Sequence, residues 1–266
     1  MKLKSTPANY NQNGEDALVK VYCLPLFKNG YRDRIKDTIT VIFDVFRAST
    51  TIVLALYSGF KYVIPVKNEE DGLKIAKKIG AITAGEKGGR KIEEYHLSNS
   101  PYQVLKLGKI GKPLVLRSTN GTRIIKTLEN NNIIVIGSTV NARVVAEYTY
   151  QLALATGKPI VLIAAGRLTG PIILNAVEDI IGVAVTAKYL ENLGAKLDKS
   201  CKKIGFYYTL GKLVHKLFSH KKTLEVVKRV KSSYLKDIIL TGLIDIVNVV
   251  PKLEQENGGK IVKIEI

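Results

Sequence analysis

The chain has 266 residues, of which 46% are hydrophobic, and it carries a formal net charge of +18. This length and hydrophobic content suffice for a buried core and suit one large domain or two small ones. No run approaches the roughly 18 apolar residues that span a bilayer, and the polar residues 1–16 lack the apolar core of a signal peptide. We therefore expect a soluble, cytoplasmic protein without a membrane partner.

The positive charge is unevenly distributed along the chain. Between Cys201 and Lys236 the only acid is Glu225, against ten lysines and arginines. A basic surface attracts nucleic acid or small anions, while many lysines with few Met and Cys also fit the protein of a thermophile. No nucleic-acid-binding motif is present. We therefore expect a small anionic ligand and keep nucleic-acid binding as the alternative.

Apolar runs rich in β-branched residues alternate with helical patterns along the first 200 residues. They predict strands at 19–24, 40–45, 61–66, 113–118, 133–138 and 159–165. Helices are predicted at 49–57, 68–79, 120–128, 139–155 and 172–193, with Asn68 and Asn120 as N-caps. Strands this continuously hydrophobic are typically covered on both faces. The alternation predicts an α/β fold, layered α/β/α around a largely parallel or mixed sheet, as one body or as two α/β subdomains.

The last third of the chain has a different composition. Residues 201–266 are basic and mostly helical, and they end in predicted strands at 245–250 and 260–266, separated by the turn signal NGG at 257–259. We place a boundary near residue 200, between a catalytic region, 1–200, and the region 201–266. A single integrated domain is the alternative.

The two cysteines, Cys23 and Cys201, lie far apart and match no zinc or redox spacing. Cys23 falls within a predicted strand. We expect both to be ordinary side chains, because no feature of the sequence supports a disulfide between them.

Glycines and polar side chains gather directly after the predicted strands. The sets are Asp44, Arg47, Ser49 and Thr50; Glu86, Gly88, Gly89 and Arg90; Thr119, Asn120, Gly121 and Thr122; and Ser138 and Asn141. In an open parallel sheet, ligands bind outside the carboxyl ends of the strands, where helix N-termini present unpaired N–H groups. The pattern therefore predicts an oxyanion site, with phosphate as its ligand.

Two acids, Asp44 and Glu86, would repel a phosphate in such a site. Mg²⁺ resolves the conflict, because it binds one or two carboxylates together with phosphate oxygens and water. Each feature also has a structural explanation: Asp44 as a helix cap or partner of Arg47, the glycines as a turn, and Glu178 and Asp179 as solvated helix acids. The hypothesis depends on the features occurring together after strands.

Several motifs in register carry a resemblance to one family. They are FDVFRASTT (43–51), AGEKGGRKIEEYHLSNSP (84–101), STNGTR (118–123), GSTVNA (137–142), and AAG (164–166) with a later VED (177–179). Their order and spacing resemble those of the 2-phosphosulfolactate phosphatases, the ComB-like proteins. The resemblance implies the α/β fold of that family and Mg²⁺-dependent hydrolysis of a phosphate monoester. The implied substrate is (R)-2-phospho-3-sulfolactate, cleaved to 3-sulfolactate and phosphate on the way to coenzyme M.

The resemblance also implies roles for individual residues. The implied catalytic residues are Asp44, Arg47 and Glu86. The implied Mg²⁺ ligands are Asp44, Glu86, Glu178 and Asp179. The implied substrate- and phosphate-binding residues are Ser49, Thr50, Gly88, Gly89, Arg90, Asn99, Ser100, Thr119, Asn120, Gly121, Thr122, Ser138 and Asn141. The chain departs from the family pattern at Arg117, where a small or apolar residue is usual, and at Tyr234, where His is common.

A mechanism follows as a hypothesis. The guanidinium of Arg47 holds the phosphoryl oxygens in a bidentate geometry, and Arg90 or Lys87 meets the sulfonate or carboxylate. The nucleophile is either a metal-activated water or Asp44 itself. A rival hypothesis is a protein that binds phosphate ligands without catalysis. We expect a homodimer, since this is the commonest soluble oligomer.

Overall fold

The computed structural model describes residues 18–27, 35–130, 133–169, 172–255 and 259–265. Its strands are β1 Lys20–Leu24, β2 Ile39–Phe43, β3 Val63–Val66, β4 Ile82–Lys87, β5 Arg90–Lys91, β6 Leu114–Arg117, β7 Ile133–Gly137, β8 Ile160–Ala164, β9 Arg167–Thr169, β10 Ile172–Leu174, β11 Lys196–Leu197, β12 Val250–Glu254 and β13 Lys260–Ile264. Its helices are α1 Ala48–Tyr57, α2 Glu69–Ile79, α3 Pro101–Leu107, α4 Gly121–Leu128, the 3-10 helix η2 Thr139–Asn141, α5 Ala142–Thr156, α6 Val177–Asn192, α7 Lys199–Lys202, α8 Phe206–Ser219, α9 Lys221–Arg229 and α10 Ser233–Gly242.

Eleven of these strands form one sheet, in the order β11-β1-β8-β2-β7-β12-β13-β3-β6-β4-β5. The strands β1, β8, β2 and β7 make one parallel block, and β3, β6 and β4 make a second. The hairpin β12–β13 joins the blocks, because it pairs antiparallel with β7 on one side and with β3 on the other. The predicted mixed, largely parallel sheet is confirmed.

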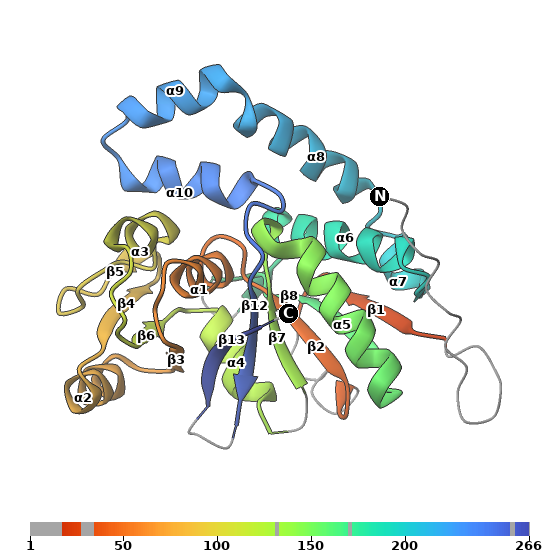
Figure 1. Ribbon diagram of the computed structural model, residues 1–266, viewed down its shortest axis with the longest axis horizontal. Coiled ribbons are helices and arrows are strands. Elements are labelled where there is room, and N and C mark those ends of the chain that lie inside the picture. The colour runs from red at the N-terminus through yellow and green to blue at the C-terminus, as the bar shows by residue number, and fades with distance from the viewer. Residues whose placement is uncertain (1–17, 28–34, 131–132, 170–171, 256–258, 266) are drawn as a thin grey trace.

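Helices cover both faces of this sheet (Figure 1). Strand β2 illustrates the cause, since all five of its residues are buried. Alternate side chains of a strand point to opposite faces. Accordingly, Ile42 enters the core formed with α1 and α4, while Val41 and Phe43 enter the core formed with α5 and α6. The layered α/β/α arrangement is the one that the continuous hydrophobic runs predict.

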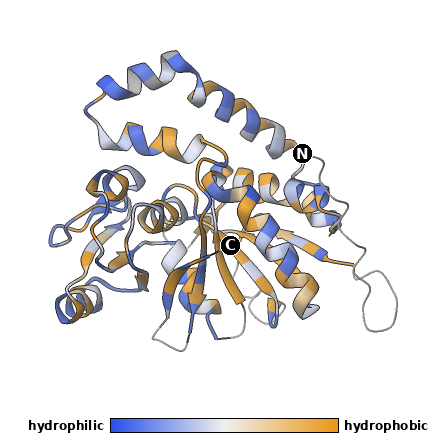
Figure 2. Cartoon of the chain, viewed as in Figure 1, coloured by the Kyte–Doolittle hydropathy of each residue, from blue (hydrophilic) through white to orange (hydrophobic). Residues whose placement is uncertain are grey.

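The basic region after residue 200 forms the helical arm α8–α10, which runs across the top of the molecule in Figure 1. Helix α8 packs against α6, and α10 packs against α3 and α8. Figure 2 shows hydrophilic residues alternating with hydrophobic ones along α8. The division at residue 200 stays a prediction, although the sheet itself continues across it through β12 and β13. Within the described ranges, no helix combines the length and apolarity needed to cross a membrane.

The two cysteines are joined in a disulfide, which was not expected from the sequence. Cys23 of β1 and Cys201 of α7 are bonded with their Cα atoms 4.8 Å apart, across 178 residues of chain. Such a separation carries no spacing signal, so only the packing of α7 beside β1 reveals the pair. The disulfide ties the start of the last third to the edge of the sheet.

Two predicted element boundaries were wrong. The helix predicted at 172–193 begins at Val177, because residues 172–174 form β10, which pairs antiparallel with β9. The strand predicted at 245–250 begins only at Val250 and continues to Glu254. Residues 257–258 of the predicted turn lie outside the described residues. Apolar content alone does not separate a short strand from a helix end or a loop.

The two predicted N-caps behave differently. Asn68 caps α2, because its Oδ1 accepts a hydrogen bond from the Asp71 N–H at 2.9 Å. Asn120 occupies the same position before α4 but makes no such bond. Its Oδ1 instead accepts from the Leu168 N–H at 3.1 Å, which joins the start of α4 to β9. Asn120 therefore organises a loop contact rather than a helix end.

Candidate active site

A polar cavity of about 420 Å³ lies beyond the carboxyl ends of β2, β4 and β6. It is where a parallel sheet is expected to bind a ligand. Strand β2 leads into Asp44, β4 carries Glu86, and β6 leads towards Thr119. The lining residues are Asp44, Phe46, Arg47, Glu86, Gly88, Gly89, Asn99, Thr119, Asn120, Arg167, Leu168, Thr169 and Tyr234. Three of the four predicted sets of polar residues therefore meet at one cavity.

Asp44 is buried at the wall of this cavity, with 6% of its surface exposed. Its Oδ2 accepts a hydrogen bond from the Gly121 N–H at 2.7 Å. Burial raises the pKa of Asp44 from 3.8 to about 6; the Gly121 hydrogen bond opposes the rise, and the negative charges of Glu86 and Glu178 add to it. A cation bound beside this buried carboxylate, or a proton on it, therefore stabilises the folded site.

Gly121 has a steric reason to be glycine. A Cβ at this position would stand 2.7 Å from Asp44 Oδ2. Only the bare backbone brings the N–H at the start of α4 this close to the carboxylate. The glycine predicted as a phosphate-binding residue therefore serves Asp44.

Arg47 is held at the cavity by a charged partner and by two rings. Its Nη1 lies 3.2 Å from Oδ2 of Asp237, which has no exposed side-chain surface. Its guanidinium also lies 5.4 Å from the ring centroid of Phe46 and 5.6 Å from that of Tyr234. Asp237 accepts further hydrogen bonds from the Ser100 hydroxyl at 2.7 Å and from the Tyr102 N–H at 3.0 Å. Arg47 itself is one of the residues that line the cavity.

Glu86 joins two of the loops that line the cavity. Its Oε1 accepts from the Thr119 N–H at 2.6 Å, and its Oε2 accepts from the Gly89 N–H at 2.7 Å and the Thr119 hydroxyl at 3.1 Å. The Gly88 N–H adds a bond of 3.3 Å to Thr119 Oγ1. Gly88 and Gly89 both have positive φ, of 58° and 83°, which side-chain-bearing residues rarely adopt. Glu86 thereby fixes the turn after β4 against the loop after β6.

Asn99 is a cavity residue with an unused acceptor. The residue is 3% exposed, and its Oδ1 accepts no hydrogen bond from the described residues. Buried polar atoms normally have partners, so an orphaned one at a cavity wall indicates a ligand donor or a bound water. Asn99 therefore fits a role in binding, as the resemblance implies.

Most of the predicted hydroxyl residues lie behind the cavity wall, outside the set that lines it. Thr50 and Ser138 share a hydrogen bond of 2.7 Å between their hydroxyls. Ser49 accepts from the Asp44 N–H at 2.8 Å, and Thr122 bonds back to Ser118. These short side chains satisfy buried backbone groups. Their part in the site is to shape the loops.

Three other predicted residues are also not brought to the cavity. Asn141 is fully buried and accepts from the Ser138 N–H at 2.8 Å, while its amide donates to Val249 O at 2.8 Å. Ser100 is the N-cap of α3 and a partner of Asp237. Arg90 is exposed on β5. The polar sequence signals at these positions arise from capping and surface exposure.

The four predicted metal ligands do not gather in one place. Asp179 is 2% exposed, and its two oxygens accept from the Val45 N–H at 2.7 Å and the Gly166 N–H at 3.0 Å. Burial raises the pKa of Asp179 well above its usual range, and the charges of Asp44 and Glu178 add to the rise. Asp179 therefore anchors the loops after β2 and β8, and it is not among the residues that line the polar cavity.

Glu178 pairs with Arg167 at 3.7 Å and lines a neighbouring apolar cavity. Asp44 and Glu86 are the two predicted ligands that line the polar cavity. Within the described ranges no three His, Cys, Asp or Glu side chains gather as a metal-holding group. Two carboxylates with a phosphate and water still match the donor set that Mg²⁺ uses.

Sequence reasoning missed Asp237 and Phe46 as site residues, and it noted Arg167 after the strand predicted at 159–165 without assigning it a role. Asp237 carried the best available signal, since it is an acid that directly follows the long basic segment and lies among apolar residues of α10. Phe46 carried none, because an aromatic ring is not unusual near the end of a strand. Only the folded chain places Phe46 and Arg167 at the cavity and Asp237 against Arg47.

The fold and the site define a class. This is a layered α/β protein in which two carboxylates, a fixed guanidinium and glycine loops face a polar cavity at the carboxyl ends of parallel strands, an arrangement suited to phosphorylated ligands. The family model for 2-phosphosulpholactate phosphatase matches residues 28–256. The chain therefore belongs to that family, and the resemblance seen in its motifs is confirmed.

Individual relatives carry the same description. A protein of Carboxydothermus hydrogenoformans, named "Probable 2-phosphosulfolactate phosphatase", is 41% identical over 130 residues, which cover 47% of this chain and 53% of the relative. A protein of the same name from Clostridium acetobutylicum is 39% identical over 136 residues, or 50% of this chain and 56% of the relative. The matches thus span about half of these relatives' length. A longer match, to a Clostridium novyi protein of that name, is 32% identical over 193 residues and covers 68% of this chain and 82% of the relative.

Proposed function

We propose that this protein is a phosphoric monoester hydrolase, and that it cleaves 2-phospho-3-sulfolactate to 3-sulfolactate and phosphate. The observation that carries the proposal is the meeting of Asp44, Arg47 and the Glu86-linked loops at one polar cavity. Family membership and the names of the relatives support the substrate.

Arg47 and the glycine loops bind the phosphoryl group in this proposal. Asp237 and two aromatic rings hold the guanidinium in a fixed orientation, so little side-chain freedom is lost when it meets two phosphoryl oxygens. The side-chain amides of Asn99 and Asn120 offer further polar contacts at the cavity wall. Arg167 supplies a second positive charge for the carboxylate or sulfonate of the ester.

Asp44 and Glu86 are the residues that would hold Mg²⁺, directly or through water. When bound, the ion offsets phosphoryl charge and positions a nucleophilic water. The negative charges of Glu86 and Glu178 contribute to the raised pKa of Asp44, and a cation bound beside Asp44 would offset this repulsion. Glu178 and Asp179 are no longer part of the proposed metal site, since neither of them lines the polar cavity.

Either water or Asp44 attacks phosphorus and expels the 2-oxygen of sulfolactate, which leaves with a proton. Attack by water inverts the configuration at phosphorus. Attack by Asp44 makes an aspartyl phosphate that water then cleaves, and the two displacements together retain the configuration. The stereochemistry of a chiral phosphorothioate product therefore identifies the nucleophile.

The experiment that tests the function is phosphate release by the purified chain. Racemic 2-phosphosulfolactate, 2-phospholactate and 2-phosphoglycerate are compared with Mg²⁺ and with EDTA. We expect metal-dependent release that is fastest from phosphosulfolactate. Faster release from another ester would support the hydrolase activity but exclude 2-phosphosulfolactate as the preferred substrate. No release from any ester would overturn the proposal in favour of a non-catalytic phosphate-binding protein.

The variant Asp44→Asn tests the proposed chemistry. We expect turnover to fall by about 100-fold or more, because both routes of attack and the metal site need the carboxylate. Circular dichroism and thermal melting serve as controls for folding. A loss of less than about tenfold, or 1.4 kcal/mol, would remove Asp44 from the reaction.

Some finer expectations of the sequence remain predictions. They are the role in coenzyme M synthesis, the cytoplasmic location, the thermophilic source and the homodimer. A polyanion bound by the basic arm would appear as an affinity that falls steeply with salt.

A further inference from the structure

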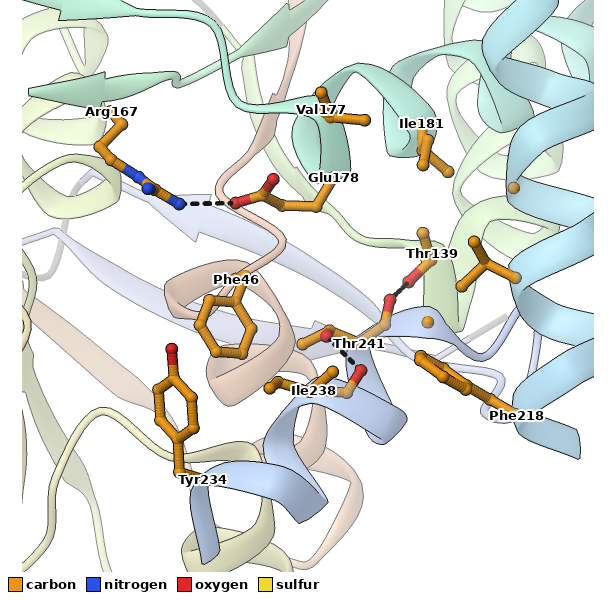
Figure 3. A pocket seen from close by; sticks show the side chains of 13 residues that line it. Phe46, Thr139, Arg167, Val177, Glu178, Ile181, Phe218, Tyr234, Ile238 and Thr241 are labelled. Atoms are coloured by element: carbon orange, nitrogen blue, oxygen red, sulfur yellow. Dashed lines mark hydrogen bonds and ion pairs between the residues drawn. The ribbon is translucent and has the colours of Figure 1, made fainter. Parts of the chain in front are cut away.

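A second cavity, of about 350 Å³, adjoins the polar one beneath the helical arm (Figure 3). Apolar side chains supply most of its wall: Phe46, Val177, Ile181, Val214, Phe218 and Ile238. They come from the loop after β2, from α6, and from the arm helices α8 and α10. The cavity therefore lies between the α/β body and the arm.

The two threonine hydroxyls and the two charged groups at this cavity already have partners. The Thr139 hydroxyl donates to Thr241 O at 2.6 Å, and the Thr241 hydroxyl donates to Ile238 O at 2.9 Å. Arg167 and Glu178 pair with each other at its rim, as Figure 3 shows. A polar ligand would find few unpaired groups here and would lose its hydration. An apolar group has no hydrogen bonds to water to lose, and its transfer from water into the cavity is favourable.

Three residues form the wall between the two cavities. Phe46, Arg167 and Tyr234 line both of them. The rings of Phe46 and Tyr234 meet edge to face, with centroids 5.5 Å apart, and Tyr234 is 52% exposed. The apolar cavity is therefore next to the place where Arg47 would hold a phosphoryl group, so one ligand can occupy both.

We propose that the apolar cavity is a subsite for the organic part of the phosphate ester, and that it takes an apolar group of about the size of a phenyl ring. An apolar cavity of roughly 150 Å³ holds benzene, so a cavity of about 350 Å³ has room for the ring and its linking carbon. This inference rests on the proposed phosphatase function. It extends that function from a small polar ester to phosphorylated 2-hydroxy acids with apolar side chains.

The test compares two esters that differ only by a phenyl ring, 2-phospholactate and 2-phospho-3-phenyllactate. We measure kcat/KM for each with Mg²⁺, and the affinity for each by calorimetry in EDTA. Burial of the ring should favour the phenyl ester by about tenfold or more in both measurements. Calorimetry needs no turnover, so it tests the subsite separately from the reaction.

A matched pair of variants on α8 locates the effect. Val214 lines the cavity, whereas its neighbour Leu213 does not and is 61% exposed. Val214→Phe fills the cavity from the arm side, and the preference for the phenyl ester should fall to about twofold or less. Leu213→Phe adds the same ring outside the cavity and should leave the preference unchanged. Melting temperatures of both variants check that the arm remains folded.

Each outcome decides one of the two proposals. Hydrolysis of both esters without a phenyl preference overturns the subsite and keeps the phosphatase. A phenyl preference in binding without hydrolysis of any ester overturns the phosphatase and keeps the subsite. Equal effects of Val214→Phe and Leu213→Phe overturn the subsite, and the absence of both binding and hydrolysis overturns both.

Discussion

Asp237 has no exposed side-chain surface, yet it lies on α10 in the basic arm and bonds to an arginine of the cavity. Burial raises its pKa, while hydrogen bonds from Tyr102, Ser100 and Arg47 oppose the rise. Such a buried acid is stable only because donors surround it. Asp237 is therefore a positioning residue for Arg47, and it couples the arm to the site.

The variant Asp237→Asn should lower kcat/KM by about tenfold to 100-fold, because a neutral amide no longer fixes the guanidinium. The loss should lie mainly in KM if Arg47 binds the phosphoryl group equally in ground and transition states. Asp245→Asn is the matched control, since Asp245 also accepts an N–H and a hydroxyl but lies outside the cavity wall. Equal kinetics for both variants would exclude the positioning role.

Asp44 should make the metal-free protein less stable as the pH rises. Its folded pKa, about 6, lies above the ordinary value of 3.8, so the folded state binds more protons than the unfolded state between these values. The free energy of unfolding contributed by Asp44 therefore falls by about 2.4 kcal/mol from pH 4 to pH 7.

Urea unfolding in EDTA measures this effect as the difference between wild type and Asp44→Asn. The variant should gain relative stability as the pH rises through this window, because its amide does not ionise. A difference that stays constant between pH 4 and pH 7 would show that the folded environment leaves the Asp44 carboxyl unperturbed. Addition of Mg²⁺ should stabilise the wild type more at pH 7 than at pH 4.

At the scale of elements, the arm depends on close helix packing. Helix α8 meets α6 at Gly211, where a Cβ would stand 2.7 Å from Ile181 Cγ2. Helix α10 approaches α8 in the same way, because a Cβ on Gly242 would meet the Phe218 ring at 2.3 Å. The apolar cavity persists beside these contacts because both helices are anchored there.

The variant Gly211→Ala should therefore destabilise the protein by about 1–3 kcal/mol. Helix propensity alone predicts the opposite, a gain of up to about 1 kcal/mol. Thr209→Ala on the exposed face of α8 is the control, and it should be neutral or slightly stabilising. Thermal melting distinguishes the two, and a stabilised Gly211→Ala would mean that α8 is not closely packed on α6.

At the scale of the whole molecule, the last third of the chain is bound into the fold at two places. The hairpin β12–β13 lies inside the sheet between its two parallel blocks, and the disulfide holds α7 to β1. The arm lies between these anchors in sequence and carries Asp237 and Tyr234 to the cavity. The site is therefore completed by a segment outside the catalytic region predicted from the sequence.

Removal of the disulfide by Cys23→Ala and Cys201→Ala should lower the free energy of unfolding by about 5 kcal/mol. The bond closes a loop of 178 residues, and the unfolded chain gains more entropy on its loss when the loop is long. Guanidinium unfolding of the double variant measures the change. The wild type in reductant should approach the same stability, and an unchanged midpoint would mean that the bond contributes nothing.

The sequence by itself determined the layers, most strands and the family. Continuous apolar runs such as that of β2 require cover on both faces, and polar groups after parallel strands must meet at one edge. These are local patterns, which can be recognised without knowing which residues are neighbours in the folded protein. Asp44, Arg47, Glu86 and the loop at Thr119 were found on this basis, and all four line the cavity.

Only the tertiary structure decided which polar groups face the ligand. Thr50 and Thr119 look alike in sequence, but the hydroxyl of Thr50 satisfies Val45 O and Ser138, whereas Thr119 lines the cavity. The disulfide and Asp237 depend likewise on contacts between residues more than 100 positions apart. Which residues share a hydrogen bond or line a cavity depends on which residues are neighbours in three dimensions, and no local sequence pattern predicts this.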